Sequence, residues 1–352
     1  MKFNILHGDN RDTLNSLADN SIDAIVTDPP YGIDFLGKDW DANTGALETY
    51  QECLRVLKPG GYILAFSAAK TYHHLAITLE QAGFEIRDQI MWLYASGFPK
   101  AHDIGKMIQK RHGGEQTSPL AQQWAGWKTA LKPAHEPICM ARKPFKGSCL
   151  DNVLTHGVGA LNIDATRIGN EEMPIGAHDQ TGCLFNPNKK SKMAEETVQG
   201  RFPSNVLGEV EGYQKFFYCP KVSRKERHVG FETKDIPTNP DGMYDTAYNQ
   251  NDEYAGKDYN AVREQSLKVG NNHPTVKPVA LMRYLIKLVT PENSVVLDPF
   301  CGSGSTGMAA VELDHEFIGC ELDPNYVDIA TKRITAWNTL EPTGTTYEQL
   351  FE

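Results

Sequence analysis

The spacing of apolar and polar residues predicts strands and helices in alternation up to about residue 95. Short apolar runs typical of strands lie at residues 3–9, 22–28, 62–68 and 84–95. The three- to four-residue spacing of helices marks residues 11–17, 46–58 and 70–83. Pro59-Gly60-Gly61 is expected to end the second helix, and Gly83 the third. This alternation predicts βαβ units around a parallel sheet, with residues 136–144 as an antiparallel partner strand.

From about residue 150 to 270 the periodic pattern is lost, and Gly, Asn, Asp and Lys dominate. This stretch is too long for a loop in a compact domain, so we interpret it as an insert, partly folded and partly irregular. Regular spacing returns with a helix at 277–290, a strand at 294–300, a glycine-rich turn at 301–307, a helix at 308–313, a strand at 316–322 and a helix at 325–337. The predicted organisation is a core part at 1–148, the insert at 149–270 and a second core part at 271–352.

Charge is unevenly distributed along this organisation. The chain has 352 residues and a net charge of −10, yet residues 100–150 contain nine Lys or Arg and three acids. Residues 186–228 contain nine Lys or Arg and five acids. A basic middle on an acidic core is expected of a surface that faces phosphates, although ordinary solvated lysines would give the same counts.

Composition narrows the class of protein. No window approaches the roughly 18–20 uninterrupted apolar residues of a membrane span, and residues 1–10 do not resemble a signal peptide. The seven cysteines lack zinc or C-x-x-C spacing, which favours reduced thiols over a metal site or disulfides. We therefore expect a cytoplasmic protein without a metal.

The strand at 22–28 ends in an unusual way, because Asp28 is followed by Pro29, Pro30 and Tyr31. Each proline locks its own φ angle and restricts the residue before it. The Asp28 carboxylate and the Pro29 carbonyl are therefore expected to be rigid acceptors at a strand end, next to an aromatic ring. The alternative interpretation is a polar turn without chemistry.

A second candidate is the glycine-rich turn after the strand at 294–300. Gly302, Gly304 and Gly307 permit positive φ and close backbone approach, and the following helix offers free N–H groups. Glu321 ends the next strand, where acids in nucleotide-binding units bind ribose hydroxyls. Tight packing of helix on sheet would also explain the glycines. In an open α/β sheet the carboxyl ends of the strands share one edge, so this turn and Asp28 can be neighbours.

Four motifs in this order, TDPPYG, HPTVKP, VLDPFCGSGSTG and GCELDPNY, resemble the beta-class amino methyltransferases that modify DNA on an exocyclic nitrogen. The resemblance is strongest to solitary and phage-borne members and covers roughly residues 3–145 and 270–335. It implies an α/β fold: a permuted Rossmann-like methyltransferase sheet, mostly parallel with one antiparallel strand. The insert would then be the target-recognition region, and the resemblance further implies S-adenosylmethionine as cofactor, double-stranded DNA as partner and a homodimer.

The resemblance also implies roles for individual residues. Catalysis is assigned to Asp28, Pro29, Pro30 and Tyr31. Cofactor binding is assigned to Asp9, Thr275, Lys277, Asp298, Pro299, Phe300, Gly302, Gly304, Ser305, Thr306 and Glu321. Asp9 would bind the adenine edge, Glu321 the ribose, and Thr275 and Lys277 the amino-acid end of the cofactor. Asp9 is also a plausible helix cap, and Lys277 a plausible solvated lysine.

The chemistry of amino methylation explains why these acceptors are needed. The lone pair of an exocyclic amino group is delocalised into the base, so the nitrogen is a poor nucleophile. Asp28 and the Pro29 carbonyl can accept its two N–H groups and favour a pyramidal nitrogen aimed at the methyl group. Tyr31 can stack on a flipped-out base. Trp92, Tyr94 and Phe98 would either line the base pocket or belong to the core.

Several functions stay open at this stage. The Asp before Pro-Pro-Tyr resembles adenine-N6 enzymes, whereas Ser in that position resembles cytosine-N4 enzymes. RNA or protein methyltransferases could use the same acceptor geometry, and a catalytically silent DNA-binding module could retain the fold. The insert with basic flanks favours DNA, and the retained Asp28 and glycine turn favour an active enzyme.

Overall fold

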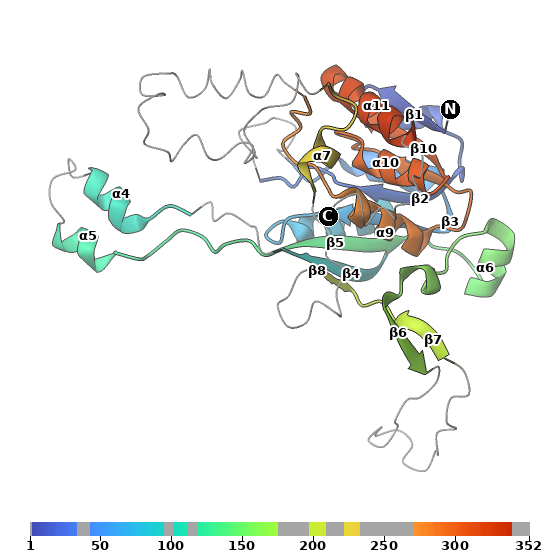
Figure 1. Cartoon of the computed structure of the whole chain (residues 1–352), viewed down its shortest axis with the longest axis horizontal. Helices are drawn as coiled ribbons and strands as arrows, with labels where there is room; N and C mark the ends of the chain where they lie inside the picture. The colour runs from blue at the N-terminus through green and yellow to red at the C-terminus, as the bar shows by residue number, and fades with distance from the viewer. Residues whose placement is uncertain are drawn as a thin grey trace, which may run out of the picture.

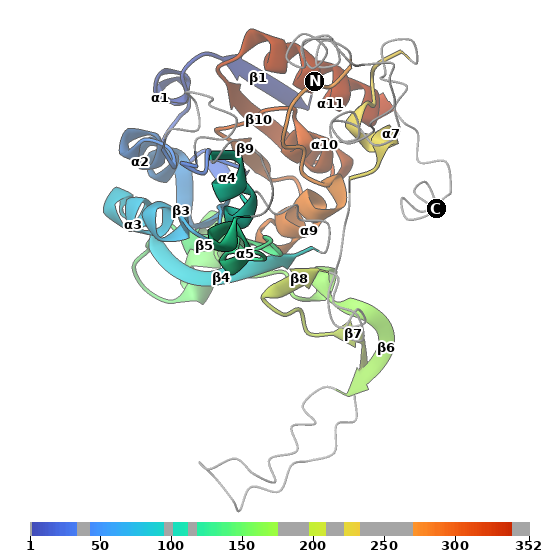
Figure 2. The same ribbon diagram turned by 90° about the vertical axis from the view of Figure 1, so that its left-hand side faces the viewer.

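The computed structural model describes residues 2–33, 43–94, 101–111, 118–174, 197–208, 222–232 and 270–339. Within these ranges an eight-stranded sheet forms the centre of the molecule, with helices on both faces (Figures 1 and 2). Its strand order is β1-β10-β9-β2-β3-β5-β4-β8. The strands are β1 Phe3–His7, β2 Ile22–Thr27, β3 Leu57–Phe66, β4 Glu85–Leu93, β5 His135–Arg142, β8 Val206–Gly208, β9 Val295–Asp298 and β10 Glu316–Glu321.

The prediction of a mostly parallel sheet with one antiparallel strand is confirmed. β5 pairs antiparallel with both β3 and β4, and the remaining pairs in this sheet are parallel. β9 and β10, from the last part of the chain, lie between β1 and β2, from the first part. The first and last parts of the sequence therefore build one sheet, as expected of a permuted arrangement.

Helices cover the two faces of the sheet in two groups. One group consists of α1 Asn10–Thr13, the short η1 Leu14–Ser16, α2 Leu47–Val56 and α3 Tyr72–Ala82. Its apolar side chains pack with Ile25, Ile63 and Leu297 from the sheet. The other group, α9 Val279–Val289, α10 Ser305–Glu312 and α11 Pro324–Thr339, packs with Val26, Leu64 and Val296. Alternate residues of each strand thus face opposite cores, which explains why β2 is buried throughout.

The expected helix stop at Pro59-Gly60-Gly61 is wrong, because α2 already ends at Val56 and these residues begin β3. Gly60 N–H donates to the Lys143 carbonyl at 3.0 Å, and Lys143 N–H donates to the Gly61 carbonyl at 2.9 Å. A Cβ on Gly61 would lie 2.8 Å from the Asp23 carbonyl oxygen. The glycines therefore permit close backbone approach within the sheet and do not end the helix.

The predicted glycine turn is shorter than expected, since α10 begins at Ser305, three residues before the predicted start. The helix starts directly after Gly304, which has a φ of 79° and supplies the turn. Among the described cysteines, Cys53, Cys139, Cys301 and Cys320 are buried, and Cys149 is exposed.

The described parts of the insert are folded and attached to the core. They comprise α6 Cys149–His156, η4 Asp164–Thr166, the two-stranded ribbon of β6 Ile168–Pro174 and β7 Thr197–Arg201, the edge strand β8, and α7 Arg224–Arg227. β8 extends the main sheet beside β4, whereas the ribbon projects from the body (Figure 2). Two further helices, α4 Ile104–Arg111 and α5 Pro119–Gln123, lie between β4 and β5. None of the described helices has the length and apolar character needed to span a membrane.

Candidate active site

Four acidic residues lie along one edge of the sheet, at or next to the carboxyl ends of four adjacent strands. Asp9 follows β1, Glu321 ends β10, Asp298 ends β9 and Asp28 follows β2. The strands are parallel neighbours in that order, so residues separated by nearly the whole chain share this edge. The structure thus brings the proline-containing segment beside the glycine turn, as the sequence predicted.

Asp28 is the centre of a dense polar cluster. Its Oδ2 accepts a hydrogen bond from Lys277 Nζ at 2.6 Å, and its Oδ1 accepts one from the Tyr31 hydroxyl at 2.7 Å. Glu136, at the start of β5, lies 2.9 Å from the Tyr31 hydroxyl and 3.4 Å from Lys277 Nζ. Lys277 Nζ also lies 3.0 Å from the Tyr31 oxygen. The three ammonium hydrogens therefore face three acceptors, which fixes the ammonium group relative to both carboxylates.

Burial and charge set the protonation of this cluster. Burial, reinforced by the negative charges of Asp28 and Glu136, raises the pKa of Tyr31 well above its ordinary value, so the phenol remains neutral. Burial favours the neutral form of Lys277, but the same two carboxylates outweigh that effect and raise its pKa. The Lys277 ammonium thus lies close to the carboxylates of both Asp28 and Glu136. The Tyr31 hydroxyl can donate its single hydrogen to one of these carboxylates at a time.

The aromatic residues around this cluster occupy its walls. The Tyr31 ring is partly buried against the core, and Lys277 Nζ lies 4.9 Å from the centre of the Phe66 ring. Trp92 packs edge to face on Phe66, and Tyr94 follows with its ring centre 5.3 Å from that of Trp92. Burial, followed by the charge of Glu136, raises the pKa of Tyr94 to about 12. Trp92 therefore packs against the core, and Tyr94 lies at the Asp28 cluster. Phe98 lies outside the described residues.

Asp298 connects the two halves of the edge. Its carboxylate accepts hydrogen bonds from the hydroxyls of Thr27 at 2.7 Å and Thr306 at 2.6 Å, and from Phe300 N–H at 3.1 Å. Burial raises its pKa to about 6, while these three donors act in the opposite direction. Asp298 therefore fixes the end of β2, the turn and the start of α10 relative to one another.

The turn after β9 needs glycine for steric reasons. Gly302 and Gly304 have φ values of 52° and 79°. A Cβ on Gly302 would lie 2.8 Å from His273 Nε2, and one on Gly304 would lie 3.0 Å from Ala330 Cβ. Burial lowers the pKa of His273 to about 3, so a neutral imidazole covers the turn. On its other side Arg333 donates to the carbonyl and hydroxyl oxygens of Ser303.

The two acids beside this turn have backbone partners. Glu321 accepts hydrogen bonds from Gly302 N–H at 2.7 Å and Asp323 N–H at 2.9 Å. Asp9 caps α1 by accepting from Arg11 N–H at 2.9 Å, and its hydrogen bonds to Arg11 lower the pKa of the carboxyl. The neighbouring Asn10 donates to the Pro299 carbonyl at 3.0 Å, which ties the β1 turn to the β9 turn.

The other predicted cofactor residues are distributed as follows. Pro299 and Phe300 belong to the β9 turn, and Ser305 and Thr306 begin α10. Thr275 lies near His273, to whose Nδ1 it donates at 3.4 Å. Lys277, however, lies in the Asp28 cluster, where its Nζ is 2.6 Å from Asp28 Oδ2.

Sequence reasoning missed Glu136, His273 and Arg333. Glu136 had a usable signal, because an antiparallel strand begins at the edge where its parallel neighbours end. His273 is the first residue of the HPTVKP motif, but the motif implied no role for it, and its contact with Gly302 depends on tertiary packing. Nothing in the sequence identified the fully buried Arg333 on α11.

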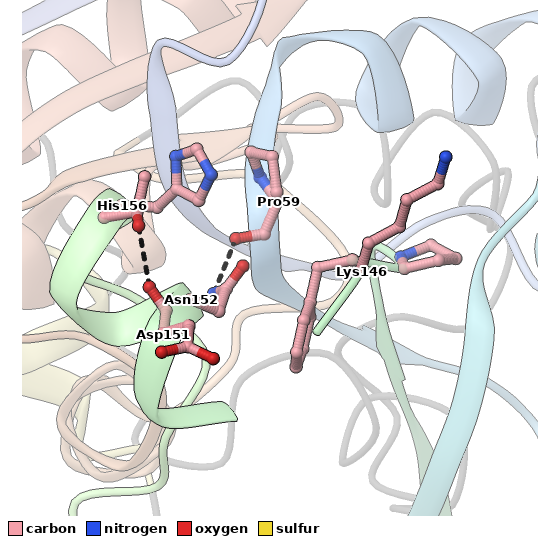
Figure 3. Close-up of a pocket in the computed structure, with 8 residues that line it drawn as sticks. Pro59, Lys146, Asp151, Asn152 and His156 are labelled. Carbon is pink, nitrogen blue, oxygen red and sulfur yellow. Dashed lines mark hydrogen bonds between the residues drawn. The ribbon is translucent and has the colours of Figure 1, made fainter. Parts of the chain in front are cut away.

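A shallow cavity of about 380 Å³ lies at the opposite edge of the sheet (Figure 3). Its lining includes Pro59, Lys146 and His156. Asn152 donates to the Pro59 carbonyl at 3.0 Å and thereby fixes the start of β3. This cavity is remote from Asp28 because it adjoins the amino end of β3 and the carboxyl end of the antiparallel β5.

Comparison with known proteins identifies the family. Residues 22–332 match the family model of N6/N4 methyltransferases described as DNA methylase. The chain belongs to this family. The matched range includes the Asp28 cluster and the β9 turn, and begins after Asp9. The methylase is therefore a DNA methyltransferase whose Asp28 edge lies within the region that defines the family.

Curated relatives span nearly the same length as this methylase. Type II methyltransferase M.HindIII of Haemophilus influenzae is 27% identical, covering 94% of each chain. DNA adenine methyltransferase YhdJ of Escherichia coli is 24% identical, covering 94% of this chain and 82% of the relative.

Solved structures include the M1.HpyAVI–SAM complex, which is 18% identical with a TM-score of 0.44 and covers 94% of this chain and 99% of that chain. The cytosine-N4-specific PvuII DNA methyltransferase is 15% identical with a TM-score of 0.47, covering 94% of this chain and 86% of that chain.

Proposed function

We propose that this DNA methylase transfers a methyl group from S-adenosylmethionine to the N6 nitrogen of a flipped-out adenine in duplex DNA. The observation that carries the proposal is the position of Asp28 and Pro29 at the end of β2, directly beside the glycine turn of β9. The Asp28 carboxylate and the Pro29 carbonyl, as acceptors for the amino group of the base, then lie next to the β9 turn, where a nucleoside cofactor would bind.

The residues of the cofactor half fit such a molecule by their chemistry. Glu321 offers carboxylate oxygens suited to ribose hydroxyls, and Asp9 offers an acceptor for an adenine amino group. The carboxylates along the edge also complement the positive charge of a sulfonium. When bound, S-adenosylmethionine supplies the electrophilic methyl group. M1.HpyAVI is a structural neighbour solved with this cofactor.

The base half supplies acceptors and a surface for the ring. A carboxylate has about four lone-pair sites, so the hydrogen bonds that Asp28 accepts from Lys277 and Tyr31 leave sites for an amino group. The Lys277 ammonium donates to this carboxylate, which suits an acceptor that orients the nitrogen rather than a strong base. With the Pro29 carbonyl as second acceptor, the nitrogen lone pair is turned toward the methyl group, and the proton can leave after transfer.

Two observations favour adenine over cytosine. The residue before Pro-Pro-Tyr is Asp, which resembles the adenine-N6 group, and the relative YhdJ is named a DNA adenine methyltransferase. The insert between β5 and α9 would read the target sequence, because it occupies the position of the target-recognition region in the resembling enzymes.

Product analysis tests the proposal. Purified protein is incubated with unmodified plasmid DNA and S-adenosylmethionine carrying a labelled methyl group, and the nucleosides are separated after digestion. The expected product is N6-methyl-2′-deoxyadenosine from the DNA. Label in N4-methylcytosine would overturn the choice of base, and label only in a parallel RNA sample would overturn the DNA substrate.

A further inference from the structure

The two helices between β4 and β5 form a separate arm, defined as residues 101–111 and 118–134. The arm projects from the body (Figure 1), and in the view along it α4 and α5 lie in front of the sheet (Figure 2). It leaves the sheet after β4 and returns at β5. Because β4 runs parallel to β3 and β2, both connections lie at the edge that contains Asp28.

The arm has a defined internal structure. Ile104 N–H donates to the Trp127 carbonyl at 2.9 Å, and Thr129 N–H donates to the His102 carbonyl at 3.1 Å. Gly105 lets the two helices approach closely, since a Cβ there would lie 2.8 Å from the Ala121 carbonyl oxygen. Tyr94 N–H donates to the Ala134 carbonyl at 3.0 Å, which continues the β4–β5 pairing to the base of the arm. The arm is thus a folded helical unit with a fixed attachment.

Large apolar side chains on this unit are exposed. The Trp124 and Trp127 rings pack edge to face with centres 5.1 Å apart, yet 61% of Trp127 is exposed. Leu131 is 92% exposed, and Met107 and Leu120 are also exposed. Isolated exposed apolar residues are common, but this group lies on one short unit and indicates a contact surface.

The same unit is strongly basic in a protein that is acidic overall. Its cationic residues are Lys106, Lys110, Arg111, Lys128 and Lys132, and the single acid among the described arm residues is Asp103. Asp103 lies 3.9 Å from Lys128 and so offsets one of these charges. Lys106, Lys110 and Arg111 are exposed on α4.

These features favour nucleic acid over a second copy of the chain as the partner that binds the surface of the arm. A symmetric dimer through the arms would place two basic surfaces against each other, which is electrostatically unfavourable. A duplex supplies phosphates for the cations, and sugar edges and grooves accept exposed aromatic or apolar side chains. We propose that the arm binds the DNA duplex beside the target base, with α4 at the phosphates and the tryptophan pair against the groove.

The location of the arm supports this assignment. Glu136, which contacts the Tyr31 hydroxyl at 2.9 Å, follows the last arm residue by two positions. Duplex DNA that delivers a base to Asp28 must pass the edge from which the arm projects. The arm would thus add a contact outside the insert, and this inference rests on the DNA substrate of the family, independently of the base that is methylated.

The test is the salt dependence of DNA binding by the full-length protein. A fluorescent 40-base-pair duplex of mixed sequence is titrated at several salt concentrations with the wild type and with the triple variant Lys106→Ala, Lys110→Ala, Arg111→Ala. Each lost phosphate contact lowers the slope of log affinity against log salt by about 0.9, so three contacts weaken binding roughly 10-fold to 100-fold near 0.1 M salt. Because binding to mixed-sequence DNA is electrostatic, the test does not require the recognition sequence.

The matched control is Lys2→Ala, Lys146→Ala, Lys332→Ala, which removes equal charge away from this edge. It should retain the wild-type slope. Equal slopes for the arm variant and the wild type would overturn the proposal. An equal loss in the control would also overturn it, because it would reveal a general effect of net charge.

A second variant, Trp127→Ala, tests the aromatic contact without changing charge. Thermal unfolding should match the wild type because the side chain is largely exposed. The expected result is weaker binding of the 40-base-pair duplex with an unchanged salt slope. If Trp127→Ala instead lowers the mass of the particle in solution and leaves DNA affinity intact, the arm is a surface between copies and the DNA assignment is wrong.

Discussion

Asp28 follows β2 and Asp298 ends the neighbouring β9, but the two acids are surrounded by different kinds of groups. Asp28 meets an ammonium, a phenol and the nearby carboxylate of Glu136. Asp298 meets two hydroxyls and a backbone N–H, all neutral. The Asp28 cluster thus concentrates charge among side chains, whereas Asp298 and Glu321 fix backbone turns; in the proposed function the first is the base half and the second the cofactor half.

This contrast separates two kinds of effect. Substitutions in the base half should change the rate of transfer, because they alter acceptors that act on the reacting nitrogen. Substitutions in the cofactor half should change stability and cofactor affinity, because they alter the shape of turns.

Asp28→Asn should lower kcat by roughly 100-fold to 1000-fold, the usual loss when one preorganised electrostatic partner of a reaction is removed. The shape is retained, but the charge that Lys277 balances is lost. Methyl transfer to plasmid DNA at saturating cofactor measures kcat, and equilibrium dialysis with labelled cofactor provides the control. Near-normal transfer by the variant would show that Asp28 is not the acceptor.

Glu136→Gln should lower kcat by about 10-fold to 100-fold, equivalent to roughly 1.5–3 kcal/mol for a hydrogen bond with a charged group. Lys277 would then be balanced by Asp28 alone, which weakens Asp28 as an acceptor. Steady-state kinetics should show little change in the KM for the cofactor. A change confined to that KM would place Glu136 in the cofactor half and contradict the contrast.

Asp298→Asn should alter how stability depends on pH. The pKa of Asp298 is raised to about 6, so the native state binds its proton more tightly than the unfolded state. The stabilisation is complete below the unfolded value near 4 and is lost as pH rises through 6, by roughly 1–3 kcal/mol. Urea unfolding from pH 4 to 7 should show this decline in the wild type and a smaller one in the variant. Identical declines would exclude Asp298 as its source.

Asp9→Asn should have the smallest effect. Asn caps a helix about as well as Asp, and the lost ion pair with the exposed Arg11 is worth little, so the melting temperature should hardly change. If Asp9 also binds the cofactor, affinity should fall roughly 3-fold to 10-fold, the value of one hydrogen bond. Calorimetric titration with the cofactor decides between a cap alone and a cap that also binds.

The sequence predicted the edge that holds the site, because strand ends and turn glycines are local signals. Asp28 and Gly304 could be placed by their neighbours in the chain alone. The Glu136 contact with Tyr31 could not, since it depends on the register of β5 against β3 and β4. Gly60 was misread because a glycine that permits strand approach has the same local signature as one that ends a helix. For the arm, the sequence predicted only an excess of positive charge within residues 100–150 and did not predict α4 and α5.

The position of β9 and β10 between β1 and β2 also determines when the sheet can assemble during synthesis of the chain. β2, β3, β4 and β5 come from the first 142 residues, but the neighbours that complete the central sheet are made only after residue 294. During translation β1 remains unpaired until β10 emerges, and Asp28 lacks Lys277 for most of that time. Assembly of the reactive edge is thus delayed until nearly the whole polypeptide is available, and an early truncated product cannot form it.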